Sequence, residues 1–356
     1  MSSRKAVYIG GLAFGGGAPV RVESMLKNRL EDVSSCLGEL DALKAAGCEL
    51  ARVAFPSEEL CANLAEVASK AKIPIMADIH FNHRLALRAI DCGCGSVRLN
   101  PGNMDGGDGL AAVLSAARDR GTVIRVGSNG GSLSAKQIAD QNGDRCLALV
   151  HAVEEQLLPL ADAGFEDVII SAKSSSVPET LRANYILARK YPFPLHVGIT
   201  EPGGGVDGAV KSAVGIGLLL GQGIGDTMRV SLTGGSEEEV RVAYGIQRAL
   251  GIRRRGVDFI SCPGCGRRRI DVADMAEKVK HMLPEDLPDG IRVAVMGCEV
   301  NGPKEAAAAD FGVAGTAGGF VMFQKGVPIE SGETGELESA LKRRLAGLSG
   351  RNIPKK

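Results

Sequence analysis

Three cysteines near the carboxyl-terminal end of the chain have the types and spacing of metal ligands. Cys262 and Cys265 form a C-x2-C pair in the segment SCPGCGRRR, and Cys298 follows 33 residues later, directly after the apolar run IRVAVMG. Two thiolates two residues apart can bind one metal centre from a single loop, and a third can join them from another strand end. The pattern therefore predicts a metal site built on Cys262, Cys265 and Cys298.

The kind of metal depends on the fourth ligand. Structural zinc usually has four protein ligands, often with a second close pair of Cys or His. No such pair follows Cys298, and the nearest histidine, His281, falls in the middle of an expected helix. Three thiolates and one unusual ligand favour a [4Fe-4S] cluster with one distinctive iron. A structural zinc site remains the alternative.

Eight short runs rich in β-branched residues precede these cysteines and are separated by helix-length stretches. The runs are VRVESM (20–25), LARVAF (50–55), IPIMADI (73–79), SVRLNPG (96–102), VIRVGSN (123–129), DVIISAK (167–173), PLHVGIT (194–200) and TMRVSLT (227–233). Strand–helix alternation of this kind predicts a parallel sheet. Eight repeats favour a (β/α)8 TIM-type barrel over an open doubly wound sheet. We expect residues 1–250 to form this substrate-binding barrel and residues 251–356 to form a small α+β domain with the [4Fe-4S] cluster.

Polar side chains recur at the ends of the predicted strands. Alternate residues of a strand share a face, so Arg98 lies with Asn100 and Arg125 with Asn129. The expected substrate-binding set is Arg52, Asp78, Arg98, Asn100, Arg125, Asn129, Lys173, His196, Arg229 and Ser231. So many cations inside a barrel are costly unless an anion neutralises them, and a diphosphate matches their donors. His80 and Glu201, each at the carboxyl end of a strand, are the expected catalytic groups for proton transfer.

Composition narrows the class of protein further. The chain has 42 basic and 42 acidic residues, so its bulk charge suggests neither a nucleic acid nor an anionic membrane as partner. It has no apolar run long enough to span a membrane, and its first twenty residues do not read as a signal peptide. Nine widely spread cysteines argue against a disulfide framework. We therefore expect a cytoplasmic enzyme in which the other six cysteines are buried.

The paired segments SCPGCGR and MGCEVNGPKEA resemble the 4-hydroxy-3-methylbut-2-enyl diphosphate synthase family. The similarity extends along the chain through PVRVESM, CELARVAFP, ADIHF, VRLNPGN, GSL, LHVGITEPGG, KSAVGIG and GIGDTMRVSLT. It implies an iron–sulfur oxidoreductase that reductively opens the ring of 2-C-methyl-D-erythritol 2,4-cyclodiphosphate to give 4-hydroxy-3-methylbut-2-enyl diphosphate. It also implies flavodoxin or ferredoxin as electron donor, and Glu305, seven residues after Cys298, as a labile and catalytically important fourth cluster ligand.

The chain departs from the family's motifs at a few positions. VQSM becomes VESM at Glu23, and the SMTNT-like stretch becomes SMLKN, which changes residues 26–28. TEAG becomes TEPG at Pro202, and NGPGE becomes NGPKE at Lys304. Two other functions stay open on sequence grounds: a non-redox lyase or transferase with structural zinc that acts on a phosphorylated substrate, and a non-enzymatic iron sensor.

Chain geometry suggests a homodimer. The helix expected at 236–250 returns the chain to the barrel end opposite the strand termini, and few residues remain before the strand that leads to Cys262. A partner subunit arranged head to tail could supply its cluster to the barrel mouth. We therefore expect each active site to combine one subunit's barrel with the other's cluster domain.

Overall fold

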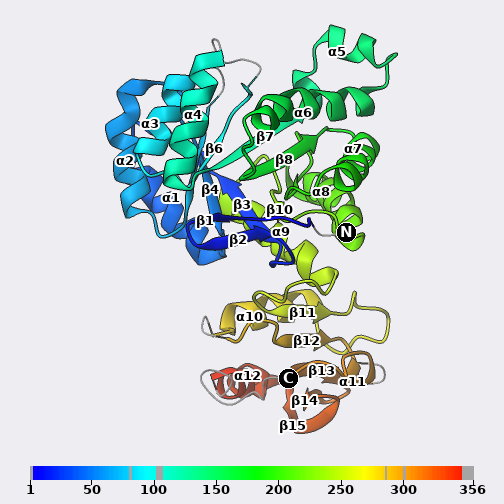
Figure 1. Ribbon diagram of the computed structural model, residues 1–356. Coiled ribbons are helices and arrows are strands. Elements are labelled where there is room, and N and C mark those ends of the chain that lie inside the picture. Colours follow the sequence, from blue (N-terminus) through cyan, green and yellow to red (C-terminus); the bar gives the residue numbers. More distant parts are fainter. Residues whose placement is uncertain (1–2, 80–81, 102–106, 285–286, 300–301, 347–356) are drawn as a thin grey trace. The chain divides into compact units, whose positions relative to one another are not determined.

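The computed structural model describes residues 3–79, 82–101, 107–284, 287–299 and 302–346. The chain divides into two compact units, Met1–Leu250 and Gly251–Lys356 (Figure 1). Among the described residues, no helix has the length and apolar character needed to cross a bilayer.

Eight parallel strands form the first unit's sheet. They are β3 (Arg21–Met25), β4 (Leu50–Ala54), β5 (Ile75–Asp78), β6 (Ser96–Arg98), β7 (Val123–Asn129), β8 (Val168–Lys173), β9 (His196–Val197) and β10 (Thr227–Met228). They are ordered β8-β7-β6-β5-β4-β3-β10-β9, and a parallel bridge between Ile170 and Leu195 joins β8 to the β9 segment. The sheet thus closes on itself, and the predicted TIM-type barrel is confirmed.

Helices cover the outside of this barrel (Figure 1). They are α1 (Val33–Ala46), α2 (Cys61–Lys70), α3 (His83–Asp91), α4 (Gly107–Arg120), α5 (Ala135–Asp140), α6 (Arg145–Asp162), α7 (Val177–Lys190), α8 (Gly205–Gly221) and α9 (Ser236–Ala249). Their boundaries follow local chemistry: the Asp32 side chain accepts the Ser35 N–H at the start of α1, and Gly47 ends α1 with φ +104°. Only glycine adopts that backbone angle at little cost, which explains the AGCEL turn.

A hairpin that the sequence pattern did not predict precedes the barrel. Strands β1 (Ala6–Ile9) and β2 (Leu12–Gly15) pair antiparallel. Their buried side chains pack against residues at the beginnings of four barrel strands, namely Leu50, Met76, Val123 and Ile169. The hairpin therefore covers the amino-terminal end of the barrel and leaves the functional groups to the other end.

The second unit has a five-stranded mixed sheet ordered β11-β12-β13-β14-β15. The strands are β11 (Asp258–Ser261), β12 (Arg292–Met296), β13 (Phe311–Thr316), β14 (Gly319–Gln324) and β15 (Val327–Glu333). The first three are parallel, and the last two continue antiparallel. Side chains of α10 (Val272–Met282) and α12 (Leu337–Ala346) share an apolar core with Val293 and Val295 of β12. The α+β class predicted for this part of the chain is confirmed.

Candidate active site and metal centre

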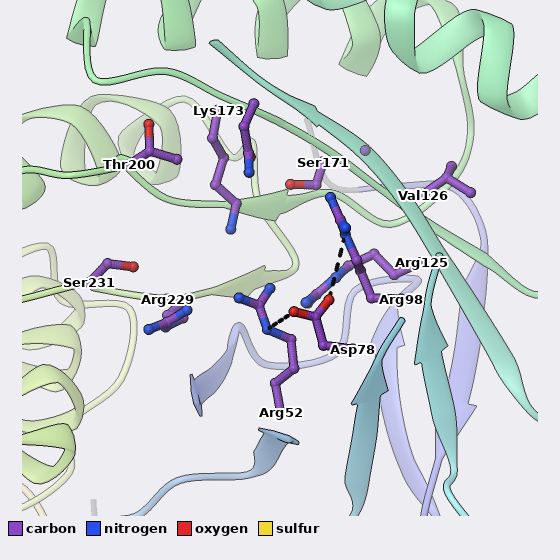
Figure 2. A pocket seen from close by; sticks show the side chains of 12 residues that line it. Arg52, Asp78, Arg98, Arg125, Val126, Ser171, Lys173, Thr200, Arg229 and Ser231 are labelled. Carbon is purple, nitrogen blue, oxygen red and sulfur yellow. Dashed lines mark ion pairs between the residues drawn. The ribbon is translucent and has the colours of Figure 1, made fainter. Parts of the chain in front are cut away.

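Polar side chains converge in a cavity of about 120 Å³ at the carboxyl ends of the barrel strands (Figure 2). Its lining residues are Arg52, Asp78, Arg98, Arg125, Val126, Gly127, Asn129, Ser171, Lys173, Thr200, Arg229 and Ser231. Strand register explains part of the convergence. Asp78 stands beside Arg98 on the next strand, and Arg98 stands beside Arg125 on the one after. Neighbours in register on a parallel sheet point to the same face, here the barrel interior.

Positive charge dominates this cavity. Of the described residues that line it, five are cations, and Asp78 is the single acid. The Asp78 carboxylate lies 3.9 Å from Nε of Arg52 and 3.9 Å from Nε of Arg98 (Figure 2). Contacts of that length only weakly offset the repulsion among the five cations. An anion that entered the cavity would relieve that repulsion.

Burial and this repulsion shift the ionisation of the cavity's bases. Burial, followed by the charges of Arg125 and Arg52, holds the pKa of the Lys173 ammonium well below its usual 10.5. Burial also lowers the pKa of the Arg52 guanidinium to about 10, against the opposing effect of Asp78. A phosphate beside these groups would raise both pKa values again, so the cavity is electrostatically suited to an anion.

A second set of side chains lies beneath the cavity. Oε2 of Glu23 accepts a hydrogen bond from Nη1 of Arg125 at 2.5 Å, and it lies 3.6 Å from Nδ1 of His196. The Met25 sulfur accepts hydrogen bonds from Arg52 Nη2 at 2.9 Å and Arg229 Nη1 at 3.5 Å. These contacts hold three of the cavity's guanidinium groups from below.

The structure brings most of the expected substrate-binding residues to this cavity. Those that line it are Arg52, Asp78, Arg98, Arg125, Asn129, Lys173, Arg229 and Ser231. Asn100 lines an adjoining hollow together with Arg98, Gly127 and Asn129. His196 instead lies fully buried beside Glu23 and is not part of either lining.

The two expected proton-transfer groups of the barrel are His80 and Glu201. His80 lies outside the described residues. Glu201 follows β9 with an exposed side chain and a backbone φ of +49°. That angle is uncommon for a residue with a Cβ, and such outliers gather at functional sites. The positive φ of Glu201 therefore marks this residue as a functional candidate, and the sequence pattern could not have predicted that backbone angle.

Sequence reasoning did not select several residues of this region. Ser171 and Thr200 line the cavity although neither was in the expected binding set. Glu23 was noted only as a departure from a motif, yet it is 1% exposed and pairs with Arg125. Strand alternation could have identified it, because Glu23 shares the inward face of its strand with Met25.

The changed loop after the first barrel strand is held by the Glu39 carboxylate. Glu39 accepts hydrogen bonds from the backbone N–H groups of Lys27 and Asn28, and from the Ser236 hydroxyl. The Lys27 ammonium donates to the carbonyls of Leu232 and Gly234 in the loop after the eighth strand. Neither Lys27 nor Asn28 lines the cavity, so both residues have a structural role in this loop.

The second unit gathers the three predicted metal-binding cysteines around one cavity of about 160 Å³. Its lining residues are Cys262, Pro263, Gly264, Cys265, Arg267, Met296, Gly297, Cys298 and Glu305. Parallel pairing of β11 with β12 brings the residues that follow both strands to the same sheet edge. The backbone N–H of Gly297 donates a hydrogen bond to Sγ of Cys262 at 3.0 Å.

Cys265 differs from two buried cysteines of the barrel in the direction of its pKa shift. Hydrogen bonds from Arg267 lower the pKa of the exposed Cys265 thiol, which favours the thiolate that binds metal. Burial instead raises the pKa of Cys48 and of Cys94 to about 12, which keeps both thiols protonated and inert.

The donor set fits an iron–sulfur group. Thiols are the ligands that hold such groups, and Cys262, Cys265 and Cys298 line one open cavity together with the Glu305 carboxylate.

Comparison with known proteins gives consistent matches along both units. Residues 4–244 match the GcpE TIM-barrel domain, and residues 258–346 match the GcpE protein C-terminal domain. A relative from Maridesulfovibrio salexigens is 46% identical and covers 90% of each chain. One from Thermodesulfovibrio yellowstonii is 44% identical and covers 95% of this chain and 96% of its own. Both are named 4-hydroxy-3-methylbut-2-en-1-yl diphosphate synthase (flavodoxin).

Proposed function

The chain belongs to the GcpE family, and on that premise we propose that it is a 4-hydroxy-3-methylbut-2-en-1-yl diphosphate synthase. The reaction is the reductive ring opening of 2-C-methyl-D-erythritol 2,4-cyclodiphosphate. Two electrons are consumed, a ring C–O bond breaks, and a hydroxyl group leaves as water. The observation that carries this proposal is the barrel cavity, in which five cations surround a space with a single acid among its described lining residues.

The substrate's diphosphate would bind to these cations. Arg52, Arg98, Arg125 and Lys173 have donors that match phosphate oxygens, and Arg guanidinium groups can bind two oxygens at once. Around these four, the proposed binding set includes Asn129, Arg229, Ser231, Asp78, the adjoining Asn100, and His196 beneath the cavity. Binding would neutralise the repulsion that Asp78 and Glu23 only partly compensate in the free barrel, which favours an anion over a neutral sugar.

The metal centre would use Cys262, Cys265 and Cys298, with Glu305 as the fourth ligand. When bound there, a [4Fe-4S] cluster supplies electrons one at a time. The protein's own contribution comes from two sets of hydrogen bonds: those from Arg267 favour the Cys265 thiolate, and the Gly297 N–H donates to the sulfur of Cys262. The Glu305 carboxylate, an exposed oxygen donor at the cavity, is the ligand most easily displaced.

Proton transfer to the departing hydroxyl needs an acid near the barrel mouth. Glu201 and His80 are the proposed groups, because both follow the carboxyl ends of barrel strands. The Glu201 side chain is exposed and therefore able to exchange protons with solvent or substrate.

Flavodoxin is the proposed electron donor, as in the names of the relatives, and ferredoxin is the other carrier of suitable type. A carrier with an acidic surface would be attracted to positive charge near the metal ligands. Three exposed arginines follow the exposed Cys265 after one glycine, namely Arg267, Arg268 and Arg269. We call these three residues the arginine patch. Carriers and thiols of this kind belong to the reducing cytoplasm, which is the proposed location.

A homodimer is part of the proposal. Tyr244 of α9 donates a hydrogen bond to the Gly47 carbonyl, and Gly47 precedes β4, so this helix ends beside the amino-terminal end of the barrel. The chain thus leaves the barrel away from its cavity. Its short continuation to β11 supports a dimer in which one subunit's cysteines serve the other's barrel.

Anaerobic purification with a turnover assay tests the function. We expect iron and sulfide in the protein and conversion of the cyclodiphosphate by reduced flavodoxin. Cys262→Ser should lose both the cluster and turnover, whereas Cys92→Ser should retain both, because Cys92 lies far from the metal-binding segments in sequence and belongs to the barrel core. A colourless zinc protein would instead support the lyase or transferase, and a cluster without turnover would support the sensor.

A further inference from the structure

Glu23 is an acid where a TIM barrel ordinarily has an apolar side chain. It is 1% exposed and occupies the middle of β3. Its neighbours Val22 and Ser24 face outward: Val22 packs in the core shared with the helices, and Ser24 donates a hydrogen bond to Glu239 of α9. Glu23 therefore points into the barrel interior, where branched apolar residues are the rule.

The partner of Glu23 comes from the opposite wall. Strands β3 and β7 are four places apart in the eight-stranded order, so the Glu23–Arg125 pair spans the barrel. Burial opposes the charge on Glu23, but Arg125, with help from Arg52 and Lys173, outweighs it and lowers the pKa of the carboxyl. The pair is therefore ionic, and it is buried on both sides.

Arg125 has a free donor on its other nitrogen. Nη1 donates to Glu23, whereas Nη2 has no hydrogen-bond partner within the described residues. A buried guanidinium N–H without a partner is costly, and Arg125 lines the anion cavity. With Nη1 bound to Glu23, Nη2 is an unpartnered buried donor on a residue that lines the cavity, and a ligand there could give it a partner.

His196 lies beside the same Glu23 oxygen that accepts from Arg125, and it supports the same arrangement. His196 is fully buried, and burial together with Lys173 and Arg125 holds the pKa of its imidazole well below 6.5. The ring is therefore neutral and does not compete with Arg125 for the carboxylate's charge. Nδ1 of His196 lies 3.6 Å from Oε2 of Glu23, which limits the space into which the carboxylate could turn.

We propose that Glu23 is a positioning residue that orients Arg125 toward the diphosphate of the substrate. This proposal rests on the proposed function, because it takes the cyclodiphosphate as the cavity's ligand. Glu23 contributes its geometry as well as its charge, because its carboxylate must reach across the barrel to Nη1 of Arg125. Two substitutions separate these contributions. Glu23→Gln keeps the reach and loses the charge, and Glu23→Asp keeps the charge and shortens the reach by one methylene.

Calorimetry of cyclodiphosphate binding to the anaerobic full-length holoenzyme tests the proposal. Loss of a charge-assisted hydrogen bond predicts a roughly tenfold higher Kd for Glu23→Asp, whereas Glu23→Gln should stay within about threefold of wild type. In an Arg125→Ala background, Glu23→Asp should cause no further loss, because its effect acts through Arg125.

Glu49→Gln is the matched control. Glu49 is also an acid in an ion pair of this barrel, but its partner is Arg21, and neither lines the cavity. This variant should change thermal stability without changing Kd. Wild-type affinity in Glu23→Asp, while Arg125→Ala binds weakly, would overturn the positioning role alone. Wild-type affinity in Arg125→Ala would overturn the anion site itself. An equal rise in Kd for Glu49→Gln would show that the effect is not specific to Glu23.

Discussion

Gly297 and Cys262 are joined by a hydrogen bond between the backbone N–H of one and the sulfur of the other, over 3.0 Å. Gly297 directly precedes Cys298, so this bond links the two segments that carry the proposed metal-binding thiols. A Cβ atom at Gly297 would lie 3.2 Å from the Cys262 sulfur and 3.0 Å from Cγ2 of Val272. The position therefore has little room for any side chain.

Gly297→Ala should weaken retention of the cluster, because the added methyl group crowds the Cys262 sulfur and strains the hydrogen bond to it. Iron and sulfide per chain after anaerobic desalting measure the effect. Gly266→Ala is the control, since a Cβ there would meet no atom within 4 Å. Equal iron content in the two variants would show that the crowding is harmless.

Affinity for the cyclodiphosphate should fall as pH rises. Burial, Arg125 and Arg52 depress the pKa of Lys173 in the free barrel, and a bound dianion would raise it again. Binding is therefore strongest below the free-state pKa, where Lys173 is already charged, and weakens as pH rises through that value toward the usual 10.5. Calorimetry in buffers with different ionisation enthalpies should show proton uptake.

Two variants identify the titrating group. Lys173→Gln should bind weakly and lose most of the pH dependence, while Arg98→Gln should bind weakly but keep it, because Lys173 is still present to titrate. Each lost charge-assisted bond should cost about 1.5–3 kcal/mol of binding free energy. If Lys173→Gln showed the wild-type pH profile, another group would be responsible.

The arginine patch should matter for flavodoxin and not for a small chemical reductant. Arg268→Gln combined with Arg269→Gln should slow flavodoxin-driven turnover several-fold, and added salt should reduce the difference from wild type. Turnover with a chemical reductant should be unchanged. Arg343→Gln is the control, because Arg343 is an exposed arginine on α12 that pairs with Glu330. Equal slowing with both reductants would point to damage at the cluster.

Two inactive variants should complement each other in a mixed dimer. Lys173→Ala disables the barrel cavity, and Cys262→Ser disables the metal centre. If one subunit's cysteines serve the other's barrel, a heterodimer has one fully intact site and should recover about half of wild-type activity. Purification through two different tags isolates the heterodimer. A verified heterodimer as inactive as its parents would mean that each barrel uses its own cysteines.

The barrel was predictable because its signal is repeated eight times. Each β-branched run corresponds to a strand, as VIRVGSN does to β7 and DVIISAK to β8. The cavity residues followed from alternation along those strands, which fixes the face of a side chain without any knowledge of its partner. Arg98 and Arg125 were therefore identifiable before their contact with the same cavity was known.

Features that depend on pairing between distant segments were not predictable in this way. The β1–β2 hairpin consists of two four-residue strands. The reason for its apolar residues becomes visible only in the structure, where they pack against the barrel. Glu23 looked like a local change of motif, because its ion pair with Arg125 joins residues 102 positions apart. The strands β13–β15 pair with their neighbours in sequence and were missed for a different reason: their glycines weaken the local strand pattern, and pairing compensates for it.

The hairpin across the amino-terminal end of the barrel affects how substrate and product enter and leave the cavity, as well as how the barrel packs. With Val7, Ile9 and Phe14 sealing that end, the cavity is a well with a closed floor. Whatever reacts there must leave by the opening through which it entered, so a linear diphosphate still in the well obstructs the next cyclic one. Turnover should therefore show product inhibition that is competitive with substrate. The rate at which the well empties would then limit how fast isoprenoid precursors can be made when the linear diphosphate accumulates.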